Sequence, residues 1–204
     1  MPTEPQPATS SRPGDQRPQF PLRLRSGLRE RHPEALEAFF ELYFEPIHRY
    51  LYRLLRSRDE AEDVTQEVFA RIHERLPMYD PSYDPRPWAF AIATHTLRSL
   101  WRRRGRAPRT QGGEQGQQAA AELFDSAEHE PERAAREGEE REQLRVALQG
   151  LPEGERLVVH LRIFEEQDYE SIGRALDLSA IAARKRYSRA LARLRDILEP
   201  EASR

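Results

Sequence analysis

The stretch at 58–69 reads RDEAEDVTQEVF and places apolar residues at helical spacing beside a row of acids. Side chains three and four positions apart lie on one face of an α-helix. We therefore expect a helix that runs to about Leu76 and opens with a capping box between Asp59 and Glu62. The apolar stripe of this helix consists of Ala61, Val64, Val68 and Ile72.

The acidic side of this helix has two interpretations. Glu60, Asp63 and Glu67 follow one another along it, with Glu62, Gln66 and Phe69 beside them. Charges steer a partner and aromatic side chains anchor it, so this side is a candidate docking face for a basic helix. An isolated acidic stripe is more often a solvated surface, and Phe69 would fit equally well in a core. The residues of this helix alone leave both interpretations open.

Upstream of this helix, the chain from Leu22 onward also has a helical pattern. Apolar residues recur at three- and four-residue steps, namely Leu36, Phe39, Phe40, Tyr43, Ile47, Tyr50, Leu51, Leu54 and Leu55. We expect Pro46 to break or kink this stretch, because proline removes a backbone donor. Residues 1–21 contain six prolines among scattered polar residues. We therefore expect a disordered tail there.

Downstream, a proline-rich connection leads to a helix that we expect from Trp88 to Arg104. This helix ends in a basic run, and residues 101–110 hold five arginines and no acid. Tryptophans can stack on unpaired bases while arginines hold the backbone. For Trp88 a place in the core is the favoured interpretation, whereas Trp101 stays open. The cations available to hold a nucleic-acid backbone are Arg98, Arg102, Arg103 and Arg104.

The last part of the chain has the pattern of a helix-turn-helix. A short helix at 169–176 is followed by a tight connector and by Ser179, which is a preferred N-cap residue. A longer basic helix then runs to about Leu198. Two helices joined by a tight turn, the second of them basic, are typical of this DNA-binding motif.

The basic helix divides into faces. Ala183, Tyr187, Ala190, Leu191 and Leu194 would pack on the preceding helices. Near the N-terminus of the helix, Ala182, Arg184, Lys185 and Ser188 are candidates to meet base edges, because arginine or lysine can bond two acceptors of guanine. Arg186, Arg189 and Arg193 are better placed for phosphates. A solvated basic face is the alternative, but the serine-capped turn favours DNA.

These patterns predict an all-α protein with two small helical domains joined by a flexible linker. We expect a tail at 1–21, a first domain at 22–104, a linker at 105–139 and a helix-turn-helix domain at 140–199. The linker is rich in Gly, Gln and Glu with little periodicity. No apolar run approaches the ~20 residues that cross a bilayer, so we expect no membrane insertion and a cytoplasmic protein.

Catalytic chemistry finds little support in the residues. The chain has no cysteine, and its six histidines show no paired spacing for a metal. No glycine-rich phosphate loop and no nucleophile elbow are present. We therefore expect no enzyme, no cofactor and no metal site. The remaining alternative is a helix-turn-helix regulator that binds duplex operator DNA alone, which would leave the 58–69 stretch and the arginine run without a purpose.

Four segments resemble the bacterial sigma factor family. The stretch at 58–69 resembles its helix that binds core RNA polymerase, and Trp88-Ala89-Phe90-Ala91-Ile92-Ala93 resembles the start of its −10 element helix. Leu151-Pro152-Glu153-Gly154-Glu155-Arg156 and residues 169–195 resemble its domain that reads the −35 element. The domain at 22–104 thus resembles sigma region 2, and the domain at 140–199 resembles region 4. This layout matches the extracytoplasmic-function (group IV) class.

The resemblance implies two partners and three binding surfaces. Core RNA polymerase would be met by Glu62, Asp63, Gln66, Glu67 and Phe69. The single-stranded −10 element would be held by Trp88, His95, Arg98, Trp101, Arg102, Arg103 and Arg104. The duplex −35 element would be met by Ala182, Arg184, Lys185, Arg186, Ser188 and Arg189.

The chain departs from the family pattern at two places. Thr94, His95 and Ser99 stand where the family commonly has Arg, Asn and Asp, so a base contact by His95 is a hypothesis. Ile181, Ala182 and Ala183 often read Gly-Thr-Val in the family. Members of this class are often restrained by an anti-sigma factor, and nothing in the residues identifies one. A further hypothesis is that acids of the linker, such as Glu128 and Glu137, shield the basic surfaces in the free protein.

Overall fold

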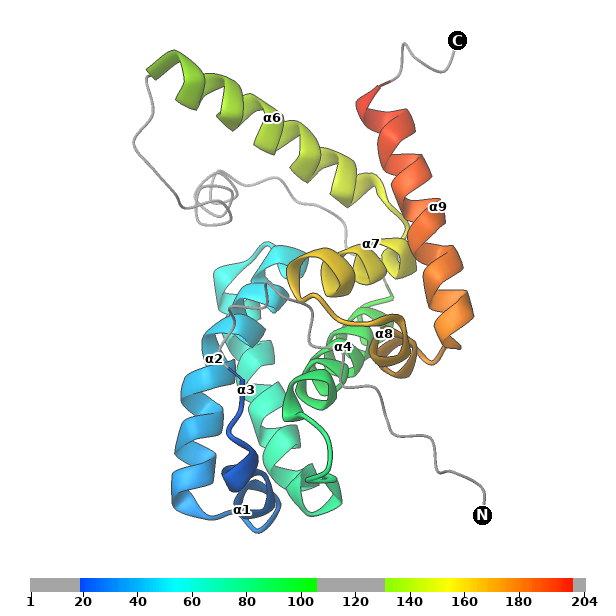
Figure 1. Ribbon diagram of the computed structural model, residues 1–204. Helices are drawn as coiled ribbons and strands as arrows, with labels where there is room; N and C mark the ends of the chain where they lie inside the picture. The colour runs from blue at the N-terminus through cyan, green and yellow to red at the C-terminus, as the bar shows by residue number, and fades with distance from the viewer. Residues whose placement is uncertain (1–18, 106–130, 200–204) are drawn as a thin grey trace.

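The computed structural model describes residues 19–105 and 131–199, which form helices and turns without a β-strand (Figure 1). The expected all-α fold is confirmed. The N-terminal domain contains η1 (Leu22–Leu24), α1 (Arg25–Arg29), α2 (Pro33–Leu55), α3 (Arg58–Arg75), η2 (Leu76–Met78) and α4 (Pro85–Arg103). The C-terminal domain contains α6 (Pro131–Gly150), α7 (Glu153–Val159), the π-helical segment η4 (His160–Phe164), α8 (Tyr169–Leu176) and α9 (Ala180–Leu198).

The N-terminal domain is built on α2, α3 and α4, which pack on one another. α2 continues through Pro46, so the break expected there is wrong. The lost hydrogen bond is tolerated because Tyr43, Ile47 and Tyr50, before and after the proline, belong to one buried face. That face is held against the other two helices along its length.

The domain begins earlier than we expected. Phe20 lies within the range that we expected to be tail, yet only 1% of it is exposed. Its ring packs edge-on against Phe39, with the centroids 6.1 Å apart, and also contacts Tyr43. Burying an aromatic ring of this size stabilises the fold. The many prolines near Phe20 in the sequence led us to expect a tail there instead. The rest of the expected tail, residues 1–18, lies outside the described residues.

α3 has a different cap from the expected one. The helix begins at Arg58, and the N-cap is Ser57, whose side-chain oxygen accepts a hydrogen bond from the backbone N–H of Glu60 at 3.3 Å. The capping box between Asp59 and Glu62 is therefore wrong. Both residues lie inside the helix, and Glu62 instead pairs with Arg58 at 3.1 Å.

The C-terminal domain contains the expected helix-turn-helix in α8 and α9. Ser179 caps α9 by accepting a hydrogen bond from the backbone N–H of Ala182 at 3.1 Å. At the turn, Asp177 takes a left-handed conformation with φ of 58°. A side chain at Gly173 would meet the carbonyl oxygen of Leu178 at 2.6 Å, so only glycine fits there. α6 begins at Pro131, which means that part of the expected linker is helical.

The two domains pack directly on each other. α8 lies against α4, and Figure 1 shows α7 and α8 beside the helices of the N-terminal domain. Buried residues of both domains, among them Leu97 and Trp101 from α4 and Leu161 and Ile172 from the C-terminal domain, belong to one continuous core. A smaller second core joins α6, α7 and α9 through Ala147, Leu151, Val159, Ala190 and Leu194.

Candidate functional site

The acidic side of α3 faces solvent along most of its length. Glu62, Asp63 and Gln66 are exposed, whereas Glu67 and Phe69 are half-buried. Glu67 accepts a hydrogen bond from Arg71 at 2.6 Å and contacts Arg103 of α4 at 3.4 Å. The structure thus brings together the five residues expected at the polymerase contact, all on one helix.

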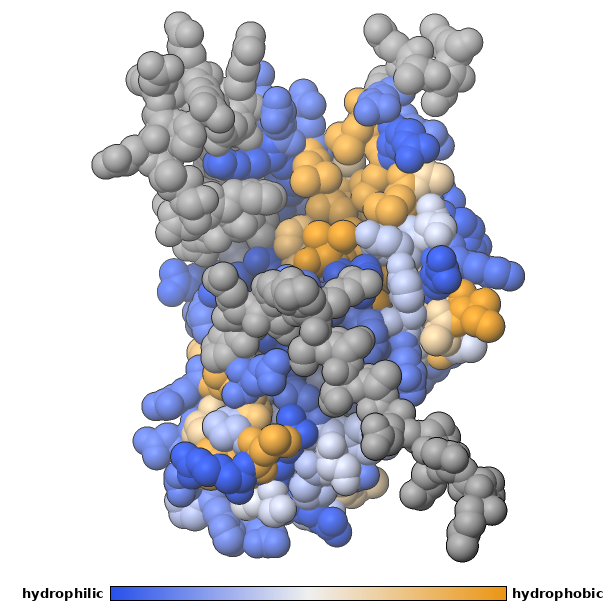
Figure 2. Space-filling model, viewed as in Figure 1, coloured by the Kyte–Doolittle hydropathy of each residue, from blue (hydrophilic) through white to orange (hydrophobic). Residues whose placement is uncertain are grey.

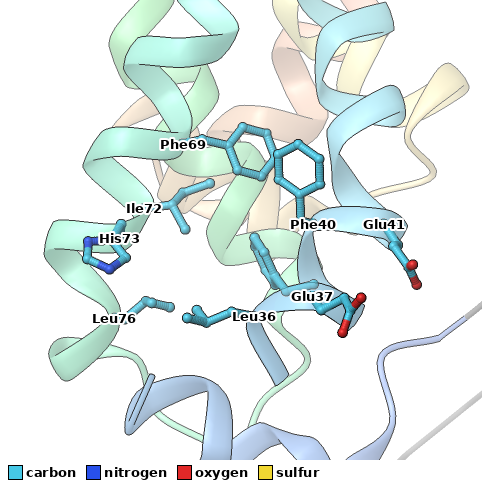
Figure 3. Close-up of a pocket in the computed structure, with 9 residues that line it drawn as sticks. Leu36, Glu37, Phe40, Glu41, Phe69, Ile72, His73 and Leu76 are labelled. Carbon is cyan, nitrogen blue, oxygen red and sulfur yellow. The ribbon is translucent and has the colours of Figure 1, made fainter. Parts of the chain in front are cut away.

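Phe69 is half-buried: it packs against the core and also forms a wall of an apolar groove between α2 and α3. Its ring lies 5.3 Å from that of Phe40 and 5.6 Å from that of Phe44. Half of Phe40 is exposed. The groove has a volume of about 530 Å³ and carries Glu37 and Glu41 on its α2 side, with His73 on its α3 side (Figure 3).

Phe40 and Phe44 were missed as site residues by sequence reasoning. Phe40 was counted only as part of the helical pattern of this stretch, and Phe44 was not singled out. A signal for this surface was nonetheless present in the sequence. The aromatic residues of this stretch span a wider arc of the helix than one buried face needs, namely Phe39, Phe40, Tyr43 and Phe44. The groove shows that the surplus aromatic residues of α2 meet Phe69 at the surface.

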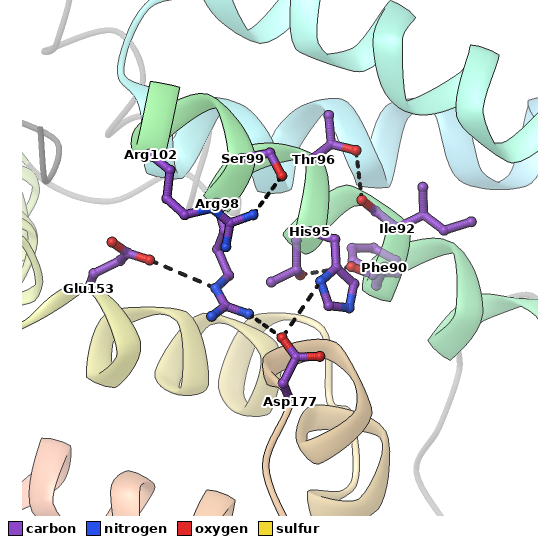
Figure 4. Close-up of polar contacts among 10 residues, drawn as sticks. Phe90, Ile92, His95, Thr96, Arg98, Ser99, Arg102, Glu153 and Asp177 are labelled. Atoms are coloured by element: carbon purple, nitrogen blue, oxygen red, sulfur yellow. Dashed lines mark hydrogen bonds and ion pairs between the residues drawn. The ribbon is translucent and has the colours of Figure 1, made fainter. Parts of the chain in front are cut away.

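The cations of α4 have acidic partners from two directions. Arg98 donates a hydrogen bond to Asp177 at 2.9 Å and lies 4.0 Å from Glu153, both in the C-terminal domain (Figure 4). Arg104 pairs with Glu60 of α3 at 2.9 Å. Arg102 is exposed and donates to the hydroxyl of Ser99. Of the cations expected to hold DNA, Arg98 and Arg104 are therefore paired with carboxylates, whereas Arg102 bonds to a hydroxyl.

The two tryptophans are both packed. Trp101, which the sequence left open, is 4% exposed, and the guanidinium of Arg156 lies 5.9 Å from its ring centroid. Trp88 is half-buried against Tyr79, with 5.2 Å between the ring centroids. In this structure Trp101 is thus covered, whereas Trp88 keeps part of its ring exposed.

His95 and Thr94 have different roles in α4. Thr94 is fully buried, where its hydroxyl donates to the carbonyl of Phe90 at 2.7 Å and shares a hydrogen bond with the Tyr50 hydroxyl at 2.9 Å. His95 is partly exposed, and its Nδ1 lies 4.0 Å from a carboxylate oxygen of Asp177. Of these two neighbouring residues, only His95 reaches the surface.

The basic face of α9 is open. Arg184, Lys185, Ser188 and Arg189 are exposed, and Ala182 and Arg186 are half-buried. No salt bridge joins these cations to any acid within 19–105 or 131–199. Arg193, farther along, pairs with Glu155 at 3.0 Å. The surface expected to meet duplex DNA is thus formed and accessible.

An exposed apolar area lies between α6 and α9, and Figure 2 shows it in the upper part of the molecule. Val146, Leu191, Ile197 and Leu198 are each at least 40% exposed there.

Among the described residues, no helix combines the length and the apolar character that crossing a membrane requires. Nor does that part of the chain bring three or more possible metal ligands together.

Two family models match the chain. Sigma-70 region 2 matches residues 39–107, and sigma-70 region 4 matches residues 147–196, which together make up more than half of the sequence. The chain belongs to the sigma-70 family, and these two regions are those of the extracytoplasmic-function (group IV) class. It is accordingly a factor that binds core RNA polymerase and promoter DNA and starts transcription, and it is not an enzyme.

Solved structures share the fold at low identity. CnrH, solved in complex with the cytosolic domain of CnrY, is 20% identical with a TM-score of 0.63, over 88% of this chain and 97% of that chain. The sigma factor RpoE from Bartonella quintana, solved with the anti-sigma factor NepR, is 20% identical with a TM-score of 0.61, over 82% of this chain and 99% of that chain. No curated protein was found to match the sequence.

Proposed function

We propose that α3 and the groove beside it form the surface that docks on core RNA polymerase. The observation that carries this proposal is the position of Phe69, which lines an open apolar groove with Phe40 while Asp63 and Gln66 stand exposed on the same helix. A buried aromatic anchor surrounded by charges is the usual composition of a strong protein contact. The acids favour a basic helical segment of the polymerase as the partner.

DNA is bound by the two other surfaces. The exposed cations of α9 place the complex on the duplex −35 element, where Arg184 and Lys185 meet base edges and Arg186 and Arg189 meet phosphates. The face of α4 with His95, Arg98 and Arg102 captures the opened −10 strand. The factor supplies binding energy for strand separation and carries out no chemistry of its own.

Co-elution with bacterial core RNA polymerase on a sizing column tests the docking face. We expect the wild type to co-elute and the double reversal Asp63→Arg with Glu67→Arg to elute alone, because both charges would repel a basic partner. The matched control is Glu170→Arg with Asp196→Arg, which changes the net charge equally on exposed positions far from α3.

Co-elution of the control and loss of the α3 variant, with unchanged circular dichroism for both, would support the proposal. Equal binding by the α3 variant and the wild type would exclude this face. If the wild type failed to bind polymerase but bound duplex DNA tightly by itself, the proposal would be replaced by its alternative. The chain would then act as a regulator that binds operator DNA without polymerase.

An anti-sigma factor is proposed as a further partner, because RpoE of Bartonella quintana was solved with one. We also place the chain in the cytoplasm, where polymerase and promoter DNA meet. Mild purification from its own cells should then yield a second protein in constant ratio that competes with core polymerase for the chain. A copurifying protein that leaves polymerase binding unchanged would argue against this partner.

A further inference from the structure

The basic face of α9 holds the only lysine of the chain. Of the 33 lysine and arginine residues, Lys185 alone is a lysine. The two residue types carry the same charge but differ in reactivity, because a guanidinium stays protonated whereas an ammonium group can lose its proton and act as a nucleophile. Lysine is accordingly the residue that acyl groups modify. Apart from the α-amine at the start of the chain, Lys185 is therefore the single amine available to an acylating reagent.

The fold leaves the amine of Lys185 accessible. The residue is exposed in the second turn of α9, which lies along the outer edge of the molecule (Figure 1). The positions one helical turn away hold Ile181 and Ala182 on one side and Ser188 and Arg189 on the other, so no acid has the spacing for an ion pair within the helix. Within 19–105 and 131–199, Lys185 forms no salt bridge with any carboxylate.

The acids that flank α9 are engaged with other cations. Asp177, in the turn that precedes the helix, pairs with Arg98 of α4 at 2.9 Å. Glu155 of α7, which packs on α9, pairs with Arg193 at 3.0 Å. No carboxylate of these elements therefore holds the Lys185 amine, and it is free to meet a reagent or a DNA strand.

The cations around Lys185 favour an anionic reagent. Arg184 and Arg189 are exposed beside it, and Arg186 lies against α7, where its Nη1 would be 2.7 Å from a Cβ atom at Gly154. A surface of one charge sign raises the local concentration of small ions of the opposite sign. Acyl phosphates combine an anionic phosphate group with a reactive carbonyl carbon. Their chemistry thus fits both the charge of this face and its single nucleophile.

We propose that Lys185 is an acylation site that accepts an acyl group from an acyl phosphate, which weakens the binding of α9 to duplex DNA and leaves polymerase docking through α3 intact. The proposal rests on the proposed role of α9 at the −35 element. The neutral Nζ attacks the carbonyl carbon, the new C–N bond forms and the C–O bond to phosphate breaks. Phosphate leaves with the electron pair and takes up one amine proton. The amide that remains is uncharged, so it no longer pairs with DNA phosphates.

The first part of the test measures where the full chain is acetylated by acetyl phosphate. Arg174→Lys supplies a comparator in the same molecule, because it places a second amine at an exposed position that Glu170 pairs with. We expect position 185 to be acetylated at least about threefold faster than position 174, as followed by peptide mass spectrometry. Lys185→Arg removes the reactive amine and should gain an acetyl group at the α-amine alone.

The second part measures binding of the full chain to a labelled, random-sequence DNA duplex at low salt. Acetylated wild type and Lys185→Gln should both bind at least about threefold more weakly than untreated wild type, because one cation is lost. The slope of log affinity against log salt should become shallower by about one. Acetyl phosphate treatment should leave the affinity of Lys185→Arg as it was before treatment, which excludes the α-amine as the cause. Co-elution with core RNA polymerase should be the same for treated and untreated wild type.

The outcomes separate this proposal from the proposed function. Acetylation at position 185 that is no faster than at position 174 would overturn the acylation site and leave the role of α9 untouched. Acetylated wild type that binds the duplex as tightly as untreated protein, or that loses polymerase, would also overturn it. If Lys185→Gln bound the duplex as tightly as wild type, the proposed DNA contact of Lys185 would itself fail, and its regulation by acylation would fail with it.

Discussion

At the scale of single residues, Thr94 shows how a departure from the family pattern is accommodated. Its hydroxyl is the partner of the buried Tyr50 hydroxyl, and burial raises the pKa of Tyr50 well above its usual range. A buried hydroxyl without a partner is costly. Thr94 therefore holds α2 and α4 together, and the sequence could not show this because the two residues are 44 positions apart.

We predict that Thr94→Val lowers the free energy of unfolding by about 1–3 kcal/mol, because it leaves the Tyr50 hydroxyl unsatisfied. Thr96→Val is the control, since the Thr96 hydroxyl bonds only to the Ile92 carbonyl of its own helix, and its cost should be clearly smaller. Urea denaturation measures both. Equal losses would mean that the Tyr50 contact contributes nothing.

His160 is a second residue whose state the fold determines. Burial, assisted by the nearby Arg53 and Arg156, lowers its pKa to about 3. The unfolded chain binds a proton at this position below about pH 6.5, whereas the folded chain does not. The stability contributed by neutral His160 is thus present above about pH 6.5 and is lost as the pH falls toward 3.

Between pH 6.5 and 5 the free energy of unfolding should therefore decrease, by at most about 1.4 kcal/mol per pH unit from this residue. His160→Phe, which can keep the ring contact with Phe164, should flatten that slope whatever its effect at neutral pH. Urea titrations at several pH values give the slope. The same slope in both proteins would show that His160 is protonated in the folded state.

At the scale of helices, the bounds of α8 and α9 could be predicted and those of α2 and α3 only in part. Ser179 is a local cap signal, and local signals need no knowledge of the fold. The passage of α2 through Pro46 and the inclusion of Phe20 depend on packing against distant segments. Local rules gave the wrong result at both places because tertiary burial outweighs a single lost hydrogen bond or a polar neighbourhood.

The α8–α9 turn depends on one glycine. Gly173→Ala should lower the free energy of unfolding by more than about 1 kcal/mol, because its new methyl group would lie 2.6 Å from the Leu178 carbonyl oxygen. Gly138→Ala in α6 has open space around it and should be neutral or stabilising by up to about 1 kcal/mol. Thermal unfolding distinguishes them, and a tolerated Gly173→Ala would contradict the close approach.

At the scale of the whole molecule, the grouping of the acids on α3 could largely be predicted, whereas the contacts of the α4 cations could not. The acids of α3 share one helix, so their grouping follows from spacing alone. The pairs Arg98–Asp177 and Arg86–Glu165 each join residues 79 positions apart. No helical periodicity predicts such a contact, and none indicates that Trp101 is covered by the second domain.

Hydroxyl-radical footprinting of the full chain, free and bound to core RNA polymerase, tests the central claim most directly, because it reports each side chain separately. We predict that Phe40 and Phe69 lose reactivity on binding, since polymerase covers the groove. Ile181, which is 71% exposed at the start of α9, should keep its reactivity without DNA. Unchanged reactivity of Phe40 and Phe69 in the complex would contradict docking through α3 and its groove.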